Sequence, residues 1–110
     1  MRRIHSDFLL NAVIVTGASP HRTLNGTYHT FQSHGTTSAG AGAATIKIQV
    51  SNVSTPTEDG HWIEAGDVSL TLGTTRTASG FALNAAWRWV RANVTAISGT
   101  NATVSVLIGT

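Results

Sequence analysis

Several residue types are rare or missing in this chain, and each absence narrows its chemistry. Its 110 residues include no cysteine, so neither a disulfide framework nor thiolate metal ligation is available. Charged residues make up only 11% of the chain, with one lysine, Lys47. Apolar residues still make up 41%, which argues against disorder. A chain of this length and composition is expected to bury a core of its own as one domain.

The scarcity of basic residues also bears on possible partners. The net charge is +2, and the one adjacent basic pair is Arg2-Arg3, whereas proteins that hold a phosphate backbone usually cluster lysine and arginine on one face. The apolar run at residues 8–15 is interrupted by Asn11 and is far shorter than the roughly 20 residues of a membrane span. We therefore expect no nucleic-acid partner, no membrane partner and no targeting segment.

Two-residue alternation of apolar and polar side chains predicts the fold. Residues 46–50 and 67–73 alternate clearly, and residues 87–97 and 102–108 are expected to pair as a hairpin across a Ser-Gly turn. No stretch shows sustained helical periodicity. We predict an all-β fold, an antiparallel jelly-roll-like β-sandwich of about seven to eight strands.

Domain organisation and loops follow from the same pattern. Residues 1–8 are predicted to be an N-terminal arm able to reach a neighbouring subunit, and residues 9–110 a single β-sandwich domain whose first strand covers residues 9–16. The Gly-, Ala- and Thr-rich residues 35–44 and the residues 74–80 are predicted to be loops. Residues 81–86 are compatible with a helical turn or an irregular segment.

The strand at residues 87–97 carries the clearest functional signal. Its alternation predicts that Val90, Ala92, Val94 and Ala96 face the core. The opposite side would then present the row Trp87, Trp89 and Arg91, and tryptophan and arginine are enriched at binding hot spots. Trp62 and Trp87 are also compatible with core positions. Our candidate protein-interaction residues are Trp87, Trp89, Arg91, Arg2 and Arg3.

Catalytic patterns are missing. The five histidines lie in unrelated segments or on opposite faces of one strand, the five carboxylates are scattered, and no serine lies in a Gly-x-Ser-x-Gly elbow. The acidic pair Glu58-Asp59 lies in a turn, where solvation and turn capping account for it. We expect a protein that is not an enzyme and that has no metal site and no cofactor.

Three segments together resemble a known group of proteins. They are residues 31–52 (FQSHGTTSAGAGAATIKIQVSN), residues 68–73 (VSLTLG) and residues 89–106 (WVRANVTAISGTNATVSV). The chain from about residue 8 to residue 109 resembles small virion proteins of tailed bacteriophages, and the third segment is the most specific part. The acidic turn at residues 56–61 is longer than that resemblance suggests.

The resemblance implies a compact β-sandwich displayed in many copies on a phage particle, without catalytic activity. Its function would be that of a capsid decoration or cement protein, bound to the major capsid protein or another virion protein and forming a homo-oligomer. Its location would be the virion, assembled in the host cytoplasm. A neck or tail component is an alternative, and a carbohydrate-binding module that aids host adsorption through its tryptophans is another.

Overall fold

The computed structural model describes residues 6–24, 28–84 and 86–109, and these contain strands and one short 3-10 helix but no α-helix. The elements, in chain order, are β1 (Ser6–Val13), β2 (Gly17–Ala18), β3 (Arg22–Thr23), β4 (Tyr28–Thr36), β5 (Ala39–Ser51), η1 (Asp59–His61), β6 (Ile63–Leu72), β7 (Thr77–Asn84), β8 (Trp89–Thr100) and β9 (Thr103–Gly109). The predicted all-β class is confirmed. The strand expected at residues 67–73 is part of the longer strand β6, which begins at Ile63 and ends at Leu72.

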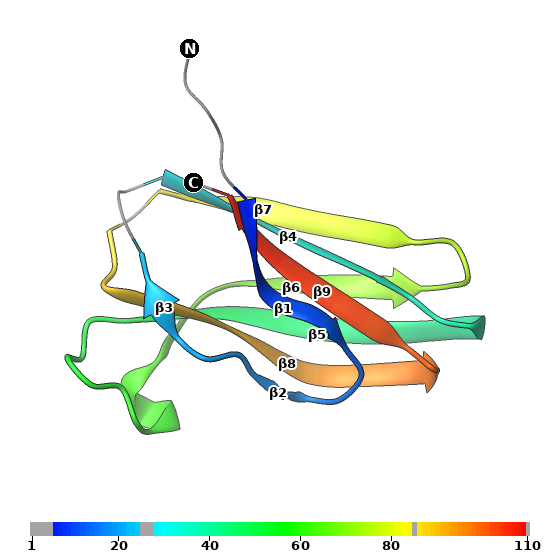
Figure 1. Cartoon of the computed structure of the whole chain (residues 1–110), viewed down its shortest axis with the longest axis horizontal. Coiled ribbons are helices and arrows are strands. Elements are labelled where there is room, and N and C mark those ends of the chain that lie inside the picture. The colour runs from blue at the N-terminus through cyan, green and yellow to red at the C-terminus, as the bar shows by residue number, and fades with distance from the viewer. Residues whose placement is uncertain (1–5, 25–27, 85, 110) are drawn as a thin grey trace, which may run out of the picture.

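The strands form two antiparallel sheets, shown one above the other in Figure 1. Sheet A has the order β1-β9-β4-β7, and sheet B has the order β2-β8-β5-β6, with the short β3 also paired to β8. If β2 and β3 are counted as one edge strand, this is the eight-stranded jelly-roll arrangement. Among the described strands, β5 and β6 are the one consecutive pair that forms a hairpin, and the other long strands alternate between the sheets.

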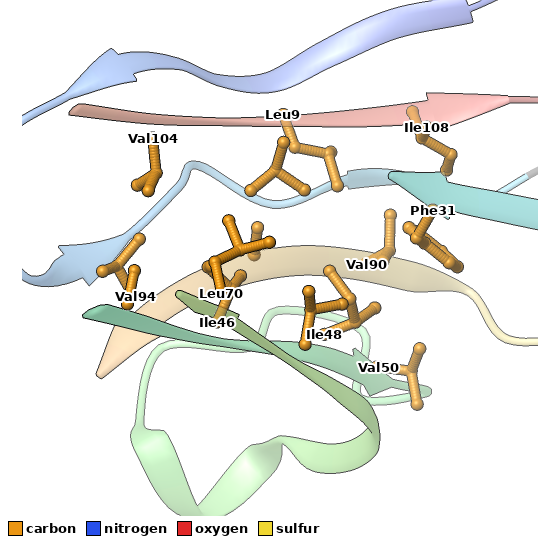
Figure 2. Packing of buried hydrophobic residues seen from close by; sticks show 14 of the residues in the cluster. Leu9, Phe31, Ile46, Ile48, Val50, Leu70, Val90, Val94, Val104 and Ile108 are labelled. Carbon is orange, nitrogen blue, oxygen red and sulfur yellow. The ribbon is translucent and has the colours of Figure 1, made fainter. Parts of the chain in front are cut away.

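The core lies between the sheets, because alternate residues of every long strand point inward. Figure 2 shows Leu9, Val104 and Ile108 of sheet A directed toward Ile46, Ile48 and Val90 of sheet B. Phe31 of β4 and Phe81 of β7 extend this core with a ring separation of 5.4 Å, and Phe81 fits against the sheet because Gly66 has no side chain there. Burial of these apolar surfaces is the main source of stability.

Residues 39–44 are not the loop that their composition predicted, because they form the start of β5. Their small side chains have a structural cause: a Cβ atom at Gly42 would lie 2.2 Å from the Ser98 carbonyl oxygen. Residues 77–84 form β7, which corrects the loop predicted at 74–80 for residues 77–80 and shows that residues 81–84, left open between a helical turn and an irregular segment, are a strand. Low side-chain complexity here reflects close backbone approach rather than mobility.

The predicted hairpin between residues 87–97 and 102–108 is also wrong. β8 belongs to sheet B and β9 to sheet A, where β9 pairs with β1 and β4. The turn between them passes from one sheet to the other, with Gly99 at φ 117° and Asn101 at φ 49°. Glycine and asparagine tolerate such left-handed backbone, so the turn signal is real although the pairing inferred from it is not.

β1 begins earlier than expected and ends earlier. Residues 6–8, assigned to the arm, belong to β1, where Ser6 pairs with Gly109 and Phe8 with Leu107. Residues 14–16, expected in the first strand, form the turn to β2. The other arm residues, 1–5, lie outside the described residues. Within the described ranges no helix is long and apolar enough to span a membrane.

Candidate functional site

β8 has the face pattern that its alternation predicted, up to a bulge. Val90, Ala92 and Val94 are buried with at most 1% exposure, as expected. Ala96 is exposed, which corrects its assignment to the core. The cause is a register shift opposite Thr45 and Ile46 of β5, since one extra residue moves every later side chain to the other face.

Trp87 does not belong to the outward row. It precedes the first residue of β8 and is partly buried, packed against the hydrophobic core between the sheets. The alternation that placed it beside Trp89 assumed a strand beginning at residue 87. Its core role, which the sequence left open, is the one the structure shows.

Trp89 does lie on the outer face of sheet B, but its polar group already has a partner. The indole Nε1–H donates a hydrogen bond to the Val53 carbonyl oxygen at 2.9 Å. The His21 ring meets the indole edge-on at 4.9 Å between ring centroids, and the Arg88 guanidinium lies 5.5 Å from the indole centroid. Trp89 is therefore held by the residues that follow β5 and by its neighbours on the sheet.

Arg91 is still more enclosed, with 13% of its side chain exposed. Its Nε donates to Gln49 Oε1 at 2.7 Å, and its Nη2 donates to Asp59 Oδ1 at 3.1 Å. The guanidinium lies 4.6 Å from the ring centroid of Trp62, within the range of a cation–π contact. Trp62 is itself buried, with 9% exposure.

These contacts attach the β5–β6 connection, residues 52–62, to the outer face of sheet B. Besides the Val53 and Asp59 contacts, Asn52 Oδ1 accepts a hydrogen bond from the Arg88 backbone N–H at 3.0 Å. Figure 1 shows this connection and η1 below sheet B, near the start of β8. We call Trp62, Trp89 and Arg91 the clamp. Its chemistry is that of a loop anchor, because its donors and ring faces contact groups of this chain.

Sequence reasoning named Trp89 and Arg91 but missed their partners Gln49, Asp59 and His21. The one available signal was weak: the turn at Glu58-Asp59 is acidic, and Arg91 of β8 was predicted to lie on the outer face. The separation of 32 residues between Arg91 and Asp59 is set by the fold, not by any local pattern. Nothing in the sequence near His21 indicated an aromatic contact.

The two other candidate residues, Arg2 and Arg3, lie outside the described residues. Among the described residues, Arg22 of β3 donates to Asp7 of β1 at 2.9 Å and so links the edges of the two sheets. This hydrogen bond lowers the pKa of the Asp7 carboxyl below its usual value, and the Phe8 backbone N–H acts in the same direction. Within the described ranges, no three histidine or carboxylate side chains gather as metal ligands do.

The opposite end of the sandwich has exposed apolar side chains. Ile14 and Val15, in the turn after β1, are 64% and 65% exposed. Ile14 and the half-buried Ile97 of β8 border a hollow of about 270 Å³ at the turn from β8 to β9. We call Ile14, Val15 and Ile97 the apolar corner. Contiguous exposed apolar patches mark contact surfaces, whereas isolated apolar side chains are common on any protein surface.

Comparison with known proteins adds information on the fold. The structure is similar to that of the SPBc2 prophage-derived protein YomS, with a TM-score of 0.58 and 12% identity over 98% of this chain and 94% of that chain. A second solved structure, described as "CBM4 structure and function", gives a TM-score of 0.49 and 11% identity over 84% of this chain and 54% of that chain. At these identities the likeness concerns the fold alone. No protein-family model and no curated protein sequence matches the chain.

Proposed function

We propose that this chain is a structural protein of a bacteriophage virion, and that it decorates or cements the capsid by protein–protein contact rather than by catalysis. The observation that carries the proposal is the apolar corner, where two aliphatic side chains are each more than 60% exposed. Desolvation of such side chains favours association with a partner surface. The partner in this proposal is the major capsid protein.

Two further observations support it. The prophage-derived protein YomS shares the fold over nearly the whole of both chains. The segments that resemble small virion proteins of tailed phages include β5, β8 and β9, the strands that supply most of the core. A neck or tail position would use the same contact chemistry with a different partner.

The proposed contact surface is not the outward side of β8 with Trp89 and Arg91, which the sequence predicted. Trp89 and Arg91 hold residues 52–62, so a partner at that end would meet the loop rather than the row. The apolar corner lies at the other end of β8: Trp89 pairs with Ser51 at the first end, and Thr100 pairs with Ala39 at the second. Substitutions at the two ends therefore test different contacts.

The experiment is co-sedimentation of the purified chain with particles produced from the genome that carries its gene. Ile14→Ser combined with Val15→Ser should reduce particle binding about tenfold or more, because two exposed hydrophobic anchors are lost. The matched control, Val53→Ser, changes an aliphatic residue that is 39% exposed at the other end and should leave binding unchanged. Equal binding by the double variant and the wild type would contradict the contact at the corner. Absence of the chain from virions by mass spectrometry would contradict the virion role itself.

A further inference from the structure

The outer face of sheet A has a cleft that neither the clamp nor the apolar corner explains. Its volume is about 260 Å³. The pairing of β4 with β9 places two pairs of polar residues on the floor of the cleft. His34 of β4 lies opposite Ser105 of β9, and Thr36 of β4 lies opposite Thr103 of β9. Residues directly opposite on neighbouring strands direct their side chains to the same face, about 5 Å apart. The floor is thus made of one imidazole and three hydroxyl groups.

The walls come from two other segments. On one side is β1, which contributes Phe8, Asn11 and Ala12. On the other side is Arg76, in the turn between β6 and β7. Phe8 is 45% exposed, so an aromatic ring borders the cleft and is open to solvent.

The β1 wall is held in an unusual conformation. Ala12 has a φ of 53°, in the left-handed region that residues with a Cβ rarely adopt, at one of the two register shifts between β1 and β9. The Ala12 backbone N–H donates to the Oγ of Ser105, a buried residue of the floor, at 2.8 Å. Strained backbone held by a specific side chain is concentrated at ligand sites. Ser105 therefore both lines the cleft and accepts the hydrogen bond from the strained backbone at Ala12.

The charges in the cleft have one sign. Among the described residues Arg76 makes no ion pair and no side-chain hydrogen bond, unlike Arg22 and Arg91, and no aspartate or glutamate lines the cleft from β1, β4, β9 or the β6–β7 turn. Burial lowers the pKa of the His34 imidazole below 6.5, and the charge of Arg76 lowers it further. A bound anion would offset the repulsion between the Arg76 guanidinium and a protonated His34.

We propose that this cleft binds a single sugar ring that carries a carboxylate. The carboxylate would pair with the Arg76 guanidinium, the ring hydroxyls would bond to the side chains of Thr36, Thr103 and Asn11, and the apolar face of the ring would rest against Phe8. The cleft, at about 260 Å³, has room for one such ring. This inference differs from the capsid-binding proposal in the side chains it uses, since Arg76, His34 and Phe8 do not border the apolar corner, although Thr103 borders both hollows.

The test is an NMR titration of the full chain with glucuronate, using glucose as the neutral ring and acetate as the carboxylate without a ring. Glucuronate should shift the amide signals of Ala12, Thr36, Thr103 and Ser105 to saturation. Glucose and acetate should each bind about tenfold more weakly or worse, since each lacks one part of the recognition. Equal binding by glucose or by acetate, or shifts that map to another surface, would overturn the proposal.

Substitutions of single residues test the assigned site independently. Arg76→Gln should weaken glucuronate binding about tenfold, while Arg88→Gln, which removes an exposed arginine on the other sheet, should not. Affinity in the wild type should rise as the pH is lowered through the pKa of His34, because protonation adds a second positive charge, and His34→Gln should remove that dependence. Equal losses in the two arginine variants would show non-specific charge attraction and would overturn the assigned site.

Discussion

The outer faces of the two sheets differ in whether their arginine side chains have partners within the chain. On sheet B, Trp89 and Arg91 contact residues 52–62, which include the buried Trp62, so both side chains have partners within the chain. On sheet A, Arg76 lies beside an open cleft without a carboxylate partner among the described residues. Residue type alone therefore does not separate the two faces, because tryptophan and arginine, which are enriched at hot spots, here also hold a loop of the same chain.

The largest effect on stability should come from removing the indole of Trp62, one of the three clamp residues. Trp62→Ala removes a buried indole under the Arg91 guanidinium and should lower the free energy of unfolding by about 3–5 kcal/mol, as for other large aromatic truncations. The measurement is urea denaturation. Phe8→Ala on the open face of sheet A is the counterpart, and it should cost well under half as much because Phe8 is 45% exposed. Equal losses would remove the distinction between the covered face and the open face.

Removal of the Arg91 guanidinium should have an intermediate effect. Arg91→Met keeps the aliphatic stem but loses the bond to Gln49, the pairing with Asp59 and the cation–π contact, for a loss of about 1–2 kcal/mol. The pair with Asp59 contributes little of this, since 97% of the Asp59 side chain is exposed. Hydrogen exchange at residues 52–62 should accelerate in the variant. Arg76→Met is the control, because among the described residues Arg76 has no hydrogen bond or ion pair with this loop, and unchanged exchange in the Arg91 variant would show that Arg91 does not hold the loop.

The smallest effect concerns pH and the open face. Because the pKa of His34 is lower in the folded chain than its usual value of 6.5, the unfolded chain binds more protons below that pH, and stability should fall as the pH drops from about 6.5. His34→Gln should remove this part of the pH dependence. Arg76→Gln should raise the pKa of His34 only part of the way, since burial is the larger cause. An NMR titration of the His34 ring decides this, and an unchanged pKa in the Arg76 variant would place Arg76 away from His34.

The sequence was sufficient for the strand pattern but not for the pairing of the strands. Val90, Ala92 and Val94 were assigned to the core correctly, because period-two alternation is a local property of the chain. The Gly99 to Asn101 turn was also visible, but a turn does not reveal whether the next strand joins the same sheet. The small residues at 39–44 were ambiguous for a similar reason, since the contact that requires Gly42 involves Ser98, far along the chain.

The candidate site could likewise be predicted only in part. Trp89 and Arg91 were found on the predicted face, but their pairing with Val53 and Asp59 depends on how the β5–β6 connection folds back over sheet B. The cleft on sheet A was not foreseen, because it depends on the in-register rows of β4 and β9 and on the backbone at Ala12. Neither feature leaves a signal in a single segment.

The clamp is tested most directly by the exchange rate of the Trp89 indole Nε1 proton, measured by NMR. This proton should exchange slowly in the wild type and faster in Arg91→Met, because it is donated to the Val53 carbonyl oxygen of a loop that Arg91 helps to hold. Exchange at the rate of a free indole in the wild type would show that Trp89 is open to solvent. The clamp would then be absent, and the outer face of sheet B would again be a candidate contact surface.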